Sequence, residues 1–217
     1  MKPPDLILGS QSTRRRDLME QWGYRFHPMT PPYQDPPTPP AGDPRTLAVE
    51  LAAKKARSLF SNKYFSPSMG AVVVGADTIV IDSQGHLLGQ PQSRVEADLM
   101  LDAITESTHE VVTGVCVTNG KAVADTCFVD TARVRVGCLT EVLRETHLDG
   151  GGWQGKAGGY DLWDVADVWP VEVDGDPTTV AGLPMRRLVV ALRQRGITPS
   201  PGSSERPPMP SSTGNST

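Results

Sequence analysis

The chain has 217 residues, and its 38% hydrophobic content is enough for a globular interior, either one large domain or two small lobes that share a core. The formal net charge of −4 argues against a general nucleic-acid-binding protein, because such proteins present a broad basic face. The sequence has no run of about 18 apolar residues and no apolar N-terminal segment of signal-peptide length, so we expect a cytoplasmic protein without a membrane span.

The first part of the chain predicts strands that alternate with helices. A short buried strand at 6–8 is followed by helical patterns over 14–22 and 46–60. Between these helices lies the proline-rich stretch 27–44, which we predict to be an extended, stiff loop, because proline fixes φ and lacks a backbone donor. An internal loop of this length is usually functional or a linker, and we favour a functional loop because helices resume on both sides. The apolar runs AVVVGA and TIVID, at 71–82, predict two strands that Asp77 interrupts.

The second part of the chain continues the alternation and then ends in a polar tail. Its predicted elements are a helix over 95–104, strands over 110–118 and 122–136, a helix over 139–147, a strand over 165–173 and a helix over 184–195. The pattern is typical of an α/β fold with a mixed sheet flanked by helices. Residues 1–197 are therefore predicted to form the domain, and 198–217, rich in Pro, Ser and Gly, a disordered tail.

The three cysteines, Cys116, Cys127 and Cys138, are odd in number and never approach CxxC spacing. Each lies in a separate apolar stretch of the sequence, where a free cysteine behaves as a small hydrophobic residue. We therefore expect three reduced cysteines in the core.

The stretch LILGSQSTRRRDL, at 6–18, combines a buried strand, hydroxyl side chains and three arginines at the start of a helix. Backbone N–H groups and the helix dipole favour an anion there. Ser10 and Ser12 add hydroxyl donors, and Arg14 and Arg15 can hold phosphate oxygens in a bidentate manner. Alternatively, Ser12 only caps the helix and the arginines face solvent.

Asp77 is the second candidate for chemistry, because it lies between two apolar runs that should be buried. A buried carboxylate is costly unless it is paired, hydrogen-bonded or bound to a metal. Asp77 is thus predicted to act as a general base or as a Mg²⁺ ligand, with a turn residue between strands as the alternative.

Three further features carry weaker signals. Lys54 and Lys55 lie on a predicted helix, where lysines are usually solvated. The glycine-rich segment around Lys156 would let the backbone approach a ligand closely, or is only a flexible turn. His109 precedes a strand and is as compatible with a hydrogen-bonded structural role as with catalysis.

Six motifs in this order resemble those of the Maf family, also called septum-formation-inhibitor-like proteins. The resemblance covers residues 5–197. The matching segments are LILGSQSTRRRDL (6–18), KKA (54–56), GADTIV (75–80), THEVVTGV (108–115), GKAGGY (155–160) and VAGLPM (180–185). Each is weak alone, but six in order at the family's spacing are specific.

The resemblance implies an inosine-triphosphatase-like α/β fold and a nucleoside triphosphate pyrophosphatase. Such an enzyme cleaves between the α and β phosphates, giving a nucleoside monophosphate and pyrophosphate, with Mg²⁺ or Mn²⁺ as cofactor. Asp77 matches the catalytic carboxylate, and Asp77 and Asp35 are the implied metal ligands. The residues implied to bind phosphate or substrate are Ser10, Ser12, Arg14, Arg15, Lys55, Gln90, Lys156 and Trp163.

The sequence also departs from the family's pattern. Gln90 replaces a phosphate-binding lysine, and Trp163 stands where a glutamine that contacts the base is usual. These changes leave open a nucleotide-binding regulatory protein with weak or lost catalysis. The base preference is open too, because GKAGGY resembles the dTTP/UTP subgroup whereas the Asp-Pro pair in GDPTTVAGLP resembles the subgroup that acts on 7-methyl-GTP. The resemblance is compatible with a homodimer.

Overall fold

The computed structural model describes residues 5–36, 42–61, 70–120 and 125–200. Within them the chain divides into two compact units, the first containing the described residues of 5–77, 113–130 and 182–200, and the second those of 78–112 and 131–181. The predicted tail, apart from 198–200, lies outside the described residues.

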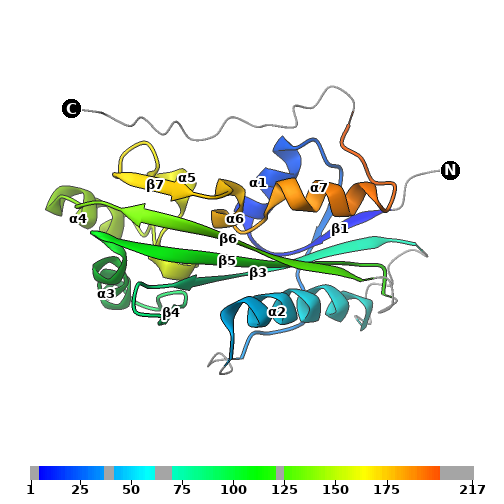
Figure 1. Ribbon diagram of the computed structural model, residues 1–217, viewed down its shortest axis with the longest axis horizontal. Coiled ribbons are helices and arrows are strands. Elements are labelled where there is room, and N and C mark those ends of the chain that lie inside the picture. Colours follow the sequence, from blue (N-terminus) through cyan, green and yellow to red (C-terminus); the bar gives the residue numbers. More distant parts are fainter. Residues whose placement is uncertain (1–4, 37–41, 62–69, 121–124, 201–217) are drawn as a thin grey trace. The chain divides into compact units, whose positions relative to one another are not determined.

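The first unit is built on strands whose order across the sheet is β2-β1-β3-β5-β6. Its strands and helices are β1 (Leu6–Gly9), α1 (Thr13–Gln21), β2 (His27–Met29), α2 (Pro44–Ser58), the short 3-10 helix Leu59–Ser61, α7 (Met185–Arg193) and the adjoining portions of β3 (Val72–Ile81), β5 (Ser107–Thr118) and β6 (Thr126–Val136). β1 pairs in parallel with both β2 and β3. Helix α2 covers one face of these strands, and α1 and α7 lie on the other (Figure 1).

The second unit contains the remaining portions of the three long strands. Its other elements are β4 (Leu87–Leu88), α3 (Arg94–Ile104), α4 (Glu141–Asp149), the short 3-10 helix Ala157–Gly159, α5 (Leu162–Val165), β7 (Val171–Asp174) and α6 (Pro177–Val180). β4 pairs antiparallel with β3, and β7 pairs antiparallel with β6. Parallel and antiparallel pairs together confirm the predicted α/β class with a mixed sheet.

Local capping explains where the helices begin. Ser12, Asp43, Ser93 and Thr140 each accept a hydrogen bond from a backbone N–H in the first turn of the helix that follows. Each unit then buries an apolar cluster of its own. Ile7, Val73, Cys116 and three alanines of α2 (Ala52, Ala53 and Ala56) belong to one cluster, and Val80, Leu101, Val134, Trp169 and their neighbours form the other.

Glycine allows α2 to lie unusually close to the sheet. A Cβ atom on Gly75 would lie 2.4 Å from the carbonyl oxygen of Ala52, and one on Gly114 would lie 2.3 Å from that of Ala48. Both distances are far below any normal contact, so only glycine fits at these two strand positions. This close approach sets the height above the sheet of every side chain that α2 carries, including Lys55.

Several predicted elements differ from the structure. Residues 72–81 form one continuous strand, because Asp77 is accommodated within β3 by side-chain partners and causes no turn. The predicted strand over 165–173 is wrong, since Asp161 caps α5 and only Val171–Asp174 pair with β6. Within the proline-rich stretch, His27–Met29 form β2, because proline is tolerated in a strand that has one neighbour only.

The prediction of three reduced core cysteines is also wrong. Cys116 and Cys127 are joined by a disulfide, and Cys138 is exposed. The sequence separation of 11 residues gave no signal for this pairing, which depends on the two residues lying on the neighbouring strands β5 and β6.

Candidate functional site

Asp77 is the centre of the candidate site in the first unit. It lies within β3 and is 8% exposed, so its carboxylate is largely removed from water. The ammonium of Lys55, on α2, lies 2.5 Å from Oδ1 of Asp77. Burial raises the pKa of Asp77, and the positive charges of Lys55 and Arg15 oppose that rise. The structure therefore rules out the turn alternative and retains a carboxylate with a raised affinity for protons.

Asp35 joins the same group of charges from the proline-rich stretch. Its Oδ2 lies 2.7 Å from the ammonium of Lys55, so that one lysine bridges two carboxylates. The side chain of Asp35 is 51% exposed, whereas that of Lys55 is 16% exposed. The usual expectation that a helical lysine is solvated is thus wrong for Lys55, although Lys54 is exposed as expected.

The segment between β1 and α1 forms a compact turn beside this cluster. Ser10 is 5% exposed, and its hydroxyl accepts a hydrogen bond from the backbone N–H of Ser12, 3.2 Å away. Ser12 caps α1 by accepting from the N–H of Arg15. The first turn of α1 holds no acidic residue, so an anion at this end of the helix would meet no opposing carboxylate from the helix itself.

Arg15 is held by the backbone on both sides of its guanidinium. Its Nε donates to the carbonyl of Gly182 at 2.7 Å, and its Nη1 donates to the carbonyl of Ala76 at 2.9 Å and to the hydroxyl of Ser10 at 3.3 Å. Burial lowers the pKa of Arg15, while Asp77 and Asp35 raise it. Arg15 therefore fixes the residue before Asp77, a positioning role that could not be predicted from the sequence.

Two candidate residues of the second unit, Gln90 and Lys156, lie in neighbouring turns, and a third, Trp163, lies in α5. Lys156 pairs with Asp164 at 2.5 Å, and the backbone N–H of Gly158 donates to the carbonyl of Gly89, next to the exposed Gln90. Gly158 has a positive φ of 73° and would place a Cβ 3.1 Å from Val80, which explains a glycine there. Trp163 is partly buried against the apolar cluster of this unit.

His109 also belongs to the second unit, and its surroundings are structural. It is 1% exposed, its Nε2 lies 2.8 Å from the hydroxyl of Tyr160, and the two rings meet edge to face. Burial lowers the pKa of His109 to about 4, so the imidazole is neutral at physiological pH. Of the two roles left open by the sequence, the structure matches the hydrogen-bonded structural one.

Asp176, the acidic residue of the Asp-Pro pair, caps a helix. Its Oδ1 accepts from the backbone N–H of Thr178 at 2.9 Å and from the hydroxyl of the same residue at 2.8 Å. Pro177 then occupies the first turn of α6, where its missing N–H costs nothing. The pair is therefore explained by local structure.

Comparisons with known proteins agree with the motifs. The family model described as Maf-like protein matches residues 5–195. A dTTP/UTP pyrophosphatase of Shouchella clausii is 36% identical over 196 residues, which are 90% of this chain and 98% of that protein. Proteins with the same name from Pyrococcus abyssi and Symbiobacterium thermophilum are 34% and 35% identical, covering 90% and 88% of this chain and 98% and 94% of their own lengths.

Proposed function

Since this chain belongs to the Maf-like protein family, we propose that it is a nucleoside triphosphate pyrophosphatase that cleaves the bond between the α and β phosphates. The observation that carries the proposal is the buried carboxylate of Asp77 with the ammonium of Lys55 at 2.5 Å. Hydrolysis of an anhydride at neutral pH needs a base that accepts a proton from the attacking water and positive charge that stabilises the phosphates. Asp77 supplies the base, and Lys55 supplies the positive charge.

We propose dTTP and UTP as the preferred substrates. The relatives from Shouchella, Pyrococcus and Symbiobacterium are all named dTTP/UTP pyrophosphatase. The Asp-Pro pair, which favoured 7-methyl-GTP at the level of sequence, has a local role as the cap of α6. That leaves GKAGGY as the signal on base preference, and it favours the pyrimidine nucleotides.

In the proposed mechanism, the carboxylate of Asp77 accepts a proton from the water that attacks phosphorus. Burial makes Asp77 a stronger base than an exposed aspartate, because it disfavours the charged form. The ammonium of Lys55 balances negative charge that develops on the leaving pyrophosphate. Ser10, Ser12 and Arg14, around the start of α1, are proposed to bind the phosphates. Arg15, Gln90, Lys156 and Trp163 stay predicted substrate residues.

The donor set beside Lys55 also suits a divalent cation. Asp35 Oδ2 and Asp77 Oδ1 lie 2.7 and 2.5 Å from the same ammonium nitrogen. The distance between the two oxygens therefore cannot exceed the sum of these two distances. Carboxylate oxygens are among the ligands that Mg²⁺ and Mn²⁺ prefer. We propose that Asp77 and Asp35 hold the cation, which when bound neutralises phosphate charge.

The decisive experiment measures pyrophosphate release from a panel of nucleotides that includes dTTP, UTP, CTP, GTP and 7-methyl-GTP, with Mg²⁺ and without it. We expect Mg²⁺-dependent turnover with dTTP and UTP as the best substrates. Asp77→Asn should lower kcat by about 10²–10⁴-fold, the usual contribution of a general base. Asp174→Asn, which removes an exposed carboxylate from the end of β7, is the matched control and should retain activity.

Failure of every nucleotide to turn over, with Asp77→Asn indistinguishable from the wild type, would refute the proposal. Calorimetry on the same panel then separates the alternatives. Tight nucleotide binding without hydrolysis would identify a regulatory protein of this family.

The proposed substrates are intracellular metabolites, and we propose a cytoplasmic location accordingly. Among the helices of the described residues, none has the length and apolar character that crossing a membrane requires. A homodimer stays a prediction.

A further inference from the structure

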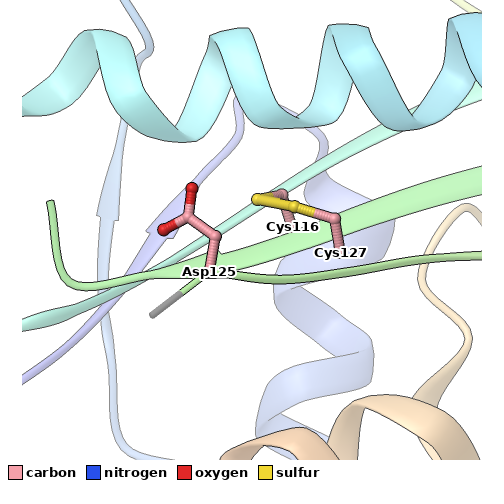
Figure 2. Close-up of side chains that lie close together, drawn as sticks. All are labelled: Cys116, Asp125 and Cys127. Carbon is pink, nitrogen blue, oxygen red and sulfur yellow. A yellow bond between two sulfur atoms is a disulfide. The ribbon is translucent and has the colours of Figure 1, made fainter. Parts of the chain in front are cut away.

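A second cluster of chemically reactive side chains lies in the first unit and has no part in the proposed hydrolysis. Cys116 is on β5, Cys127 is on the neighbouring β6, and Asp125 immediately precedes β6. Asp125 and Cys127 are two residues apart and so point to the same face of the strand. Figure 2 shows the carboxylate and both sulfurs on one side of the strands. Cys116 packs there against Ala52, Ala53 and Ala56 of α2 and is fully buried.

We propose that Cys116, Cys127 and Asp125, with the cysteines reduced, form a binding site for a thiolate-preferring divalent cation, with Zn²⁺ as the expected occupant. One ligand atom from each residue lies within 4.8 Å of the other two. Neighbouring ligands around tetrahedral zinc lie about 3.7 Å apart, as follows from Zn–S bonds of about 2.3 Å. Small side-chain rotations therefore bring all three atoms into coordination, and a water completes the site.

The surroundings of Asp125 carry the second, independent argument. Its side chain is only 6% exposed. Oδ2 accepts two hydrogen bonds from Arg57, at 2.9 and 2.6 Å, which fix the orientation of the carboxylate. Oδ1 is buried, and no donor among the described residues reaches it. A buried carboxylate oxygen without a partner is costly, and a metal ion would satisfy it.

The charges around the cluster also favour a cation. Arg57 is hydrogen-bonded to Asp125, and Arg195 interacts with the same carboxylate electrostatically. Two thiolates and one carboxylate carry three negative charges, so the two arginines alone leave one negative charge uncompensated. Arg57, which holds the carboxylate of Asp125, is itself 52% exposed. The arginine would act as the partner that orients a ligating carboxylate, a common arrangement around metal sites.

The disulfide and the cation site exclude one another, because the same two sulfurs form both. A phosphine reductant breaks the S–S bond by supplying two electrons, each sulfur takes a proton, and the phosphine becomes its oxide with oxygen from water. Binding of the cation then displaces the two thiol protons. In a reducing compartment such as the proposed cytoplasm, the cysteines are kept as thiols, and the cation site is the relevant state.

The test uses the full chain carrying Cys138→Ser, which removes the exposed free cysteine. The protein is reduced with a phosphine and dialysed against Zn²⁺ in excess Mg²⁺, so that the oxygen ligands near Asp77 are occupied. We expect about one zinc per chain. With Co²⁺ in place of Zn²⁺, we expect the charge-transfer absorption that only thiolate ligands produce.

Variants and the oxidised protein make the test specific. Cys127→Ser should abolish the charge-transfer band, and Asp125→Asn should weaken Zn²⁺ binding by about tenfold or more. Folding of each variant is checked by circular dichroism. The disulfide form of the chain that carries Cys138→Ser alone should bind no zinc, and this measurement keeps the test valid if a further variant fails to fold. Two results would overturn the proposal. One is zinc binding by a protein whose Co²⁺-loaded form lacks the thiolate charge-transfer band, and the other is equal zinc binding by the reduced and the disulfide forms. Loss of nucleotide hydrolysis would not bear on it.

Discussion

The ammonium of Lys55 lies 2.5 Å from Oδ1 of Asp77, and the two residues come from a helix and a strand that only glycine allows to approach so closely. Most of the proposed chemistry depends on this pair. Burial raises the pKa of Asp77, and the charge of Lys55 limits that rise. The pair therefore sets the pH range in which Asp77 can act as a base.

Replacing Lys55 by methionine should shift the pH dependence of hydrolysis. Without the ammonium the pKa of Asp77 rises further, so the acidic limb of the kcat profile should move to higher pH. At neutral pH we expect kcat to fall by about a hundredfold or more, because a cation near the phosphates is lost as well. The profile is measured by pyrophosphate release with saturating dTTP.

Lys54→Met is the control for that experiment. Lys54 is the preceding residue of α2, is exposed, and lies 6.0 Å from the ring centre of Tyr33. Its replacement should leave the acidic limb in place. An acidic limb in the Lys55 variant that coincides with that of the wild type would show that Asp77 is not the titrating base.

Asp35→Asn should change the requirement for the divalent cation. The residue keeps its size but loses the charge of one of the two carboxylates that contact Lys55. We expect the Mg²⁺ concentration for half-maximal activity to rise by about tenfold or more, and kcat at saturating Mg²⁺ to change much less. Titration with Mg²⁺, and separately with Mn²⁺, measures this. An unchanged titration would exclude Asp35 as a ligand.

Gly114→Ala should destabilise the first unit, because the new Cβ would lie 2.3 Å from the backbone of Ala48. The backbone of α2 would have to move away, at a cost of about 3 kcal/mol in the free energy of unfolding. Gly89→Ala is the matched control, since nothing lies within 4 Å of its Cβ position. Urea denaturation measures both variants. Equal stability of the two would show that α2 does not depend on this close approach.

The sequence predicted the parts of the site that its motifs contain. Asp77 and Lys55 do lie together, and Ser12 caps α1, the role given as the alternative to anion binding. The role of Arg15 was less accessible, because its partners are the carbonyls of Ala76 and Gly182, and backbone acceptors leave no trace in the identity of a residue. Contacts of a side chain with distant backbone can be found only from the fold.

The errors in the predicted fold have a similar origin. Asp77 looked like an interruption of a strand, because local patterns treat a charged residue as exposed, whereas its partner Lys55 is 22 residues away in sequence. Cys116 and Cys127 looked like separate core residues, because their proximity arises from the pairing of β5 with β6. In both cases a tertiary contact overrode a local preference.

His109 should make the stability of the protein depend on pH. Burial lowers its pKa from 6.5 to about 4, so between these values the unfolded chain binds a proton that the folded chain does not. Stability must therefore fall as the pH falls, and we expect His109 to account for a loss of about 2 kcal/mol between pH 7 and pH 5. His147, whose pKa burial also lowers, adds a smaller loss of the same sign.

Two variants test this interpretation by urea denaturation at pH 7 and pH 5. His109→Phe removes the titrating group and should lose most of the pH dependence. Tyr160→Phe removes the hydroxyl 2.8 Å from Nε2 but leaves the imidazole buried, so it should lower stability by about 1 kcal/mol at both pH values and keep the difference between them. If His109→Phe retained the full difference, the buried imidazole would not be its source, and the carboxylates that titrate near pH 4 would have to account for it.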